Sequence, residues 1–172
     1  MNKIVIIING KGGAGKDTIC DIVSLHYGTM NVSSIDPIKE IARRHGWQGE
    51  KDGKSRKFLA DLKRAFIEYN DLPNEYLKRK YNDFVSDPDK VILFAHIREA
   101  DQIDVFKAAV NTKCVTMLVK RDDRALGNQS DDRAGEYAYD YCYNNTGPLE
   151  NLHNDVVAFF SDLLRKENIA SR

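Results

Sequence analysis

The segment with the clearest chemical signature is a glycine-rich run near the N-terminus. It comprises Gly10, Lys11, Gly12, Gly13, Ala14, Gly15, Lys16, Asp17 and Thr18, which have the spacing G-x-x-x-x-G-K. Glycines let such a loop point successive backbone N–H groups at a phosphate, and a following helix adds the positive end of its dipole. Lys16 would reach the β- and γ-phosphates. The run therefore predicts a binding site for a nucleoside triphosphate.

The residue after Lys16 departs from the usual pattern, in which a Ser or Thr hydroxyl binds Mg²⁺. Asp17 stands there, and Thr18 follows one position later. A carboxylate is a hard oxygen ligand, so we expect Asp17 to serve Mg²⁺ and Thr18 to hydrogen-bond the α-phosphate. The alternative is that Asp17 only stabilises the positive end of the helix.

Alternating strand and helix patterns surround this loop and predict an α/β fold with a mostly parallel sheet. The predicted strands are residues 3–9, 30–33, 91–95, 114–119 and 141–144. Four predicted helices span residues 17–26, 36–44, 100–110 and 149–166, the second of them capped by Asp36. Two further helices are predicted between residues 44 and 91, one capped by Ser55 and one after Pro73. We expect the helix after Ser55 to bury an apolar face of Phe58, Leu59, Leu62, Phe66 and Tyr69.

Composition narrows the function classes. The 172 residues include 26 Lys and Arg against 26 Asp and Glu, so the net charge is zero, which argues against a dedicated nucleic-acid binder. Three scattered cysteines suit a reducing compartment, and the apolar run at 4–8 is too short to enter a membrane. We expect a single domain over residues 1–172, cytoplasmic, with no membrane or nucleic-acid partner.

Several stretches together resemble one family of kinases. The ending Gly15-Lys16-Asp17-Thr18 is similar to phage-type deoxynucleoside monophosphate kinases and to animal-type phosphomevalonate kinases. Residues 34–40, 91–98 and 140–147 resemble further segments of the first group. The resemblance implies the three-layer α/β/α P-loop kinase fold with a five-stranded sheet, a helical acceptor-binding region at 36–86 and a short lid at 121–135. It also implies transfer of the ATP γ-phosphate to a (deoxy)nucleoside monophosphate, with Mg²⁺ as cofactor.

The same resemblance assigns residues to roles. Lys16, Arg98, Arg121 and Arg124 would be catalytic, with Arg133 a weaker candidate in the lid. Asp36, Lys39, Arg56 and Arg98 would bind the acceptor. One position departs from the family: His96 stands where an acidic residue is expected at the end of a strand. Either Asp17 and Asp36 would supply the carboxylates, or the protein binds its metal in an unusual way.

The distribution of charge supports a phosphorylated acceptor. Residues 39–64 hold nine basic and four acidic side chains, whereas residues 122–140 hold two basic and six acidic ones. Basic helix faces beside a triphosphate loop suit a phosphate-bearing small molecule. The four histidines have no metal-ligand spacing, and only His96 is placed where open α/β sheets bind ligands.

Other functions fit the same residues. Lys11 and the glycines after it also resemble the deviant P-loop of partitioning and division-site ATPases, in which the early lysine reaches across a dimer. A kinase of dephospho-coenzyme A or phosphomevalonate fits as well, because the fold alone does not fix the acceptor. A non-catalytic nucleotide-binding protein is a further alternative, and the chain would be a monomer or a homodimer.

Overall fold

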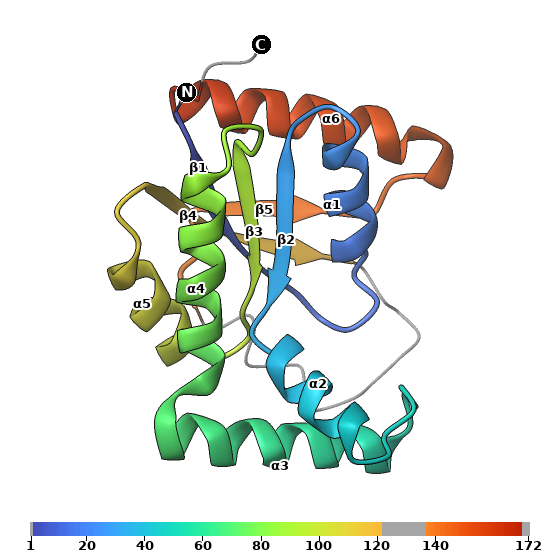
Figure 1. The fold of residues 1–172 in the computed structure, drawn as a ribbon. Helices are drawn as coiled ribbons and strands as arrows, with labels where there is room; N and C mark the ends of the chain where they lie inside the picture. Colours follow the sequence, from blue (N-terminus) through green and yellow to red (C-terminus); the bar gives the residue numbers. More distant parts are fainter. Residues whose placement is uncertain (1, 122–136, 170–172) are drawn as a thin grey trace.

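The computed structural model describes residues 2–121 and 137–169 (Figure 1). Its centre is one parallel sheet of five strands in the order β2-β3-β1-β4-β5. The strands are β1 (Ile4–Asn9), β2 (Thr29–Ser33), β3 (Ile92–His96), β4 (Lys113–Lys120) and β5 (Tyr141–Asn144). The helices are α1 (Lys16–Ser24), α2 (Asp36–Arg44), α3 (Gly53–Asn70), α4 (Leu72–Ser86), α5 (Ala100–Ala109) and α6 (Leu149–Lys166).

Strand β1 lies in the middle of the sheet, where both of its apolar faces are shielded from water. All six of its residues are buried, and it pairs with β3 on one side and β4 on the other. A continuous apolar run of this kind is typical of strands covered on both faces. The predicted alternation of strands and helices is therefore confirmed, and the sheet is wholly parallel.

Helices cover both faces of the sheet and make three layers. Ile4, Ile6 and Ile8 of β1 point into a core shared with α1 and α6, whereas Val5 and Ile7 point into a core shared with α4 and α5. Helix α3 packs against α2 and α4 and lies beyond the end of the sheet, at the bottom of Figure 1. No helix within residues 2–121 and 137–169 is long and apolar enough to cross a membrane.

The predictions for α2 and α3 were wrong in detail. Asp52, not Ser55, caps α3: its side chain accepts a hydrogen bond from Ser55 N at 2.7 Å. Ile35 is the N-cap residue of α2, and Asp36 is its first helical residue.

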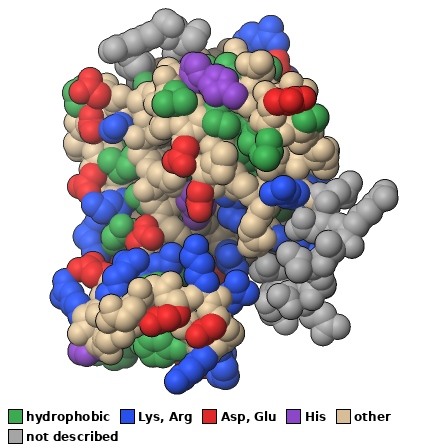
Figure 2. Space-filling view, turned by 90° about the vertical axis from the view of Figure 1, so that its right-hand side faces the viewer, with side chains coloured by type: hydrophobic (Ala, Val, Ile, Leu, Met, Phe, Trp, Pro, Cys, Tyr) green, Lys and Arg blue, Asp and Glu red, His purple; other side chains and the backbone are tan. Residues whose placement is uncertain are grey.

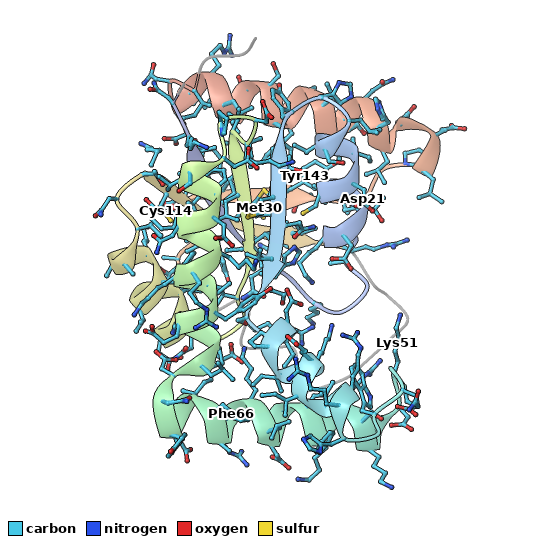
Figure 3. All side chains as sticks on the ribbon, in the orientation of Figure 1. Asp21, Met30, Lys51, Phe66, Cys114 and Tyr143 are labelled. Carbon is cyan, nitrogen blue, oxygen red and sulfur yellow. The ribbon has the colours of Figure 1, made fainter. Side chains whose placement is uncertain are left out.

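The expected apolar face of α3 was also wrong, because this helix does not lie on the sheet. Phe58 and Tyr69 are 44% and 83% exposed, and the buried residues of α3 are Ser55 and Lys63. Figure 3 shows the separation: Met30 and Tyr143 lie at the sheet, whereas Phe66 lies on α3 at the lower end of the molecule.

Candidate active site

The glycine-rich loop joins β1 to α1 and depends on backbone conformations that favour glycine. Gly13 and Gly15 have φ values of +83° and +92°, in the left-handed region. Gly10 has φ +150°, and a Cβ there would lie 2.4 Å from the carbonyl oxygen of Val119. Glycine is therefore required at Gly10 by contact with β4 as well as by conformation.

Lys16 is the first residue of α1, and its side chain turns back over the loop. Its Nζ donates hydrogen bonds to the carbonyl oxygens of Gly10 at 2.6 Å and Lys11 at 3.0 Å. The ammonium is therefore held at the loop by backbone groups, at the place where a phosphate-binding loop needs a positive charge.

Two asparagines fix the loop to its surroundings. Asn145 Nδ2 donates to the carbonyl oxygen of Ala14 at 2.9 Å, while its own N–H donates to Lys120 O at 2.7 Å. Asn9 Oδ1 accepts from Gly10 N at 2.8 Å, and its Nδ2 donates to Arg98 O at 3.1 Å. No role was predicted for either residue, although Asn145 lies in residues 140–147, which resemble a segment of deoxynucleoside monophosphate kinases.

A pocket of about 300 Å³ opens beside the loop, at the carboxyl ends of β2 and β3, where open α/β sheets bind ligands. Its lining residues are Asp17, Asn31, Val32, Ser33, Asp36, Lys39 and His96. Three predicted residues, Asp17, Asp36 and Lys39, therefore meet at one site. Asn31 and Ser33 were not predicted, because nothing in their local sequence marks them.

His96 lies at the end of β3, as predicted, and is neutral. Burial lowers its pKa to about 4. The carboxylate of Asp17 opposes this shift, whereas the positive charges of Lys16 and Lys39 add to it. Its Nε2 is 2.7 Å from Asn31 Oδ1. A neutral imidazole beside an amide therefore occupies the position where the sequence comparison had led us to expect an acidic residue.

The carboxylates of Asp17 and Asp36 fit a role in holding Mg²⁺. Magnesium in phosphoryl-transfer sites is bound through one or two carboxylates together with phosphate oxygens and water. Burial raises the pKa of Asp36, while a hydrogen bond from Ser33 N to its Oδ2 at 2.7 Å opposes that shift. Among the described residues, no three His, Cys, Asp or Glu side chains gather into a metal-binding group.

The predicted arginines lie outside the pocket lining or outside the described residues. Arg121 follows β4, and its Nη1 is 3.4 Å from Gly13 O, so it reaches the loop. Arg98 follows β3 at the same end of the sheet and is exposed, and Arg56 is exposed on α3. Arg124, Arg133 and the predicted lid from residue 122 onward lie outside the described residues.

Lys and Arg side chains gather over the lower part of the molecule, where α2 and α3 lie (Figure 2). Several of them are paired on the surface: Arg44 with Glu40, Lys57 with Asp61 and Arg64 with Asp61. Exposed pairs of this kind contribute little to stability. The predicted basic region is therefore present, partly neutralised by neighbouring carboxylates.

Comparison with known proteins identifies the fold. No protein-family model matches the chain, and no curated protein matches it by sequence. Solved structures do match over nearly the whole chain. The dephospho-CoA kinase of Campylobacter jejuni is similar with a TM-score of 0.56 at 11% identity, covering 97% of this chain and 100% of that one.

Two further structures agree. TT1252 from Thermus thermophilus matches with a TM-score of 0.54 at 17% identity, over 95% of this chain and 99% of that one. A putative kinase from Chloroflexus aurantiacus matches with a TM-score of 0.53 at 11% identity, over 96% and 97%. The glycine loop, the strand order and these similarities together show that the chain has the three-layer α/β/α fold of P-loop kinases.

Proposed function

We propose that this protein is a phosphotransferase that moves the γ-phosphate of ATP, with Mg²⁺, to a small phosphorylated acceptor, a nucleoside or deoxynucleoside monophosphate. The observation that carries the proposal is the position of Asp17, which belongs to the triphosphate loop and also lines the pocket that contains Lys39. The donor and acceptor sites therefore adjoin, as in-line transfer requires.

In this proposal the protein acts by positioning and electrostatics, because phosphoryl transfer asks for little covalent chemistry. The loop N–H groups and Lys16 hold the triphosphate, and Asp17 and Asp36 hold Mg²⁺, which would neutralise charge on the phosphates. Lys39 holds the acceptor phosphate. Arg98 and Arg121 lie on either side of β1, at the ends of β3 and β4, and would balance the charge that develops during transfer.

A second candidate is transfer to a hydroxyl group, as in the dephospho-coenzyme A type of acceptor. The observation that favours it is the environment of Asp36, whose pKa is raised by burial inside a pocket in which Lys39 is the one cationic lining residue described. A carboxylate with a raised pKa is a better general base for a hydroxyl. An acceptor phosphate oxygen needs no base. A phosphomevalonate type of acceptor belongs with the first candidate, because its nucleophile is a phosphate oxygen.

The deciding experiment is a coupled ADP-release screen. The wild-type protein is assayed with ATP and Mg²⁺ against all ribo- and deoxynucleoside monophosphates, dephospho-coenzyme A and phosphomevalonate. We expect one group of acceptors to stimulate ADP release strongly over ATP alone. Asp36→Asn separates the candidates by the size of its effect. It should abolish transfer to a hydroxyl, because the base is lost, whereas transfer to a phosphate should only weaken, because Asp17 still provides a carboxylate for Mg²⁺.

Three results would contradict the proposal. ATP binding without acceptor-dependent turnover would indicate a non-catalytic nucleotide-binding protein. ATP-dependent dimerisation without an acceptor, lost in Lys11→Ala, would indicate an assembly-switch ATPase. Lack of ATP binding would remove the triphosphate site itself.

A further inference from the structure

Lys63, in the middle of α3, is the only charged side chain among the buried residues of the described part of the chain. It is 6% exposed. Its Nζ donates to Ser34 Oγ at 2.9 Å and to Glu99 Oε2 at 2.6 Å. One ammonium therefore joins α3 to the loop after β2 and to the loop after β3.

Both partners of Lys63 lie close in sequence to residues that line the candidate acceptor pocket, Ser34 after Ser33 and Glu99 three positions after His96. Ser34 follows the pocket residue Ser33, and its N–H donates to His96 O at 3.0 Å. Glu99 follows Arg98, whose carbonyl oxygen accepts from Asn9 Nδ2. Since Asn9 also accepts from Gly10 N, hydrogen bonds and short backbone links connect Lys63 to the triphosphate loop.

Burying this ammonium has an energetic cost that an apolar residue would not incur. Desolvation of a buried ion pair often cancels its Coulomb gain, so such pairs are weak contributors to net stability. Here Glu99 keeps 39% of its side chain exposed, whereas Lys63 is enclosed. Helix α3 packs mainly on α2 and α4, and Lys63 ties it directly to the loops that follow β2 and β3. The buried charge of Lys63 is therefore better explained by a role in fixing the positions of these two loops than by a role in stabilising the fold.

We propose that Lys63 is a positioning residue that sets the distance between the two walls of the acceptor pocket. Through Ser34 it fixes the turn that carries Asp36 and Lys39. Through Glu99 it fixes the segment that carries Arg98. This inference rests on the proposed function, because it concerns the acceptor side of that same site.

The test compares Lys63→Met with Lys57→Met, a matched change on the same helix at an exposed lysine that is paired with Asp61 and does not line the pocket. A misplaced reacting group costs up to about 100-fold in rate. We expect Lys63→Met to raise the acceptor KM or lower acceptor kcat/KM by about 10- to 100-fold, with the KM for ATP unchanged. Lys57→Met should leave both values at the wild-type level.

Two further variants separate positioning from stability. The double variant Lys63→Met/Glu99→Gln leaves no unpaired charge, so we expect its Tm to recover while the acceptor kcat/KM stays low. Glu99→Gln alone keeps the lysine and should produce a smaller loss in the same direction. A role in stability alone would instead restore acceptor kcat/KM together with Tm in the double variant, which would overturn the inference.

Amide exchange keeps this test distinct from that of the proposed function. Lys63→Met should speed exchange of the Ser34 N–H, which NMR can follow without any acceptor. If the wild-type protein phosphorylates no acceptor, the proposed function fails while this measurement still reports on Lys63. The inference about Lys63 fails if the Ser34 N–H exchanges as slowly in Lys63→Met as in Lys57→Met. It also fails if the two variants of an active enzyme have the same acceptor KM and kcat/KM.

Discussion

The donor side and the acceptor side of the site are built in different ways. The donor side, residues 9–18 with Asn145, is held mostly by backbone groups: glycine conformations, loop carbonyls and the N–H of Gly10. The acceptor side, α2 with α3, lies beyond the sheet and is tied to it by side chains such as Lys63. If the proposed function is right, backbone geometry would fix a triphosphate site that is the same for any acceptor, whereas side-chain contacts would let the acceptor site vary.

The largest expected effect is on the donor side. Lys16→Ala removes the ammonium that should follow charge onto the transferred phosphate, so kcat should fall by about 10²- to 10³-fold in the ADP-release assay. Lys11→Ala is the control within the same loop and should lose far less activity in a kinase. Equal losses of activity in the two variants would contradict the proposed role of Lys16.

The next effect tests whether backbone geometry specifies the donor side. In Gly10→Ala the new Cβ would meet the Val119 carbonyl, so the free energy of unfolding should drop by about 3 kcal/mol. Gly13→Ala is the matched control, because its left-handed φ costs about 1–2 kcal/mol and no atom lies within 4 Å of the added Cβ. Urea denaturation measures both values, and a larger loss in Gly13→Ala would refute this account.

His96, where the two sides meet, should produce an intermediate effect through pH. Its pKa is about 4 in the folded protein and about 6.5 in the unfolded chain, so the unfolded chain binds more protons between these values. Stability should therefore fall as pH decreases from about 6.5 to 4, by about 2 kcal/mol at pH 5. The difference between wild type and His96→Gln in urea denaturation across this range measures the effect. A constant difference would show that His96 titrates normally.

The smallest effect is expected on the acceptor side. Lys39→Ala should raise the acceptor KM by about tenfold, since a charge-assisted hydrogen bond to the acceptor phosphate is worth about 1.5–3 kcal/mol and neighbouring groups replace part of it. The KM for ATP should not change. Lys166→Ala, at the end of α6 and paired with Asp162, is the remote control. An unchanged acceptor KM would remove Lys39 from the site.

The sequence predicted the position of the glycine-rich loop between a strand and a helix well, because the signals for these elements are local. The spacing from Gly10 to Lys16 needs no distant partner to be recognised, and the predicted strand at 3–9 differs from β1 by one residue. His96 was also placed correctly, at the end of β3, because strand ends follow directly from the apolar run before them.

The acceptor side was predicted less well because its signals depend on distant residues. The pattern of Phe58, Leu62 and Phe66 indicated a face packed on the core, but α3 lies where no sheet covers it. Burial of Lys63 depends on Ser34 and Glu99, which are 29 and 36 positions away. No local pattern marks such a contact, so a buried lysine is read as a surface one.

The strand order has a consequence for how this site can be changed. Strands β2 and β3 are neighbours in the sheet, yet α2, α3 and α4 all lie between them in the chain. The chain leaves the sheet at the carboxyl end of β2, and α4 carries it back to the opposite edge, where β3 begins beside the first residue of β2. A segment with that arrangement can be transplanted: replacing residues 36–70 by the matching excursion of another P-loop kinase would leave every strand pairing in place. Such a chimera would exchange acceptor preference while keeping the donor loop intact.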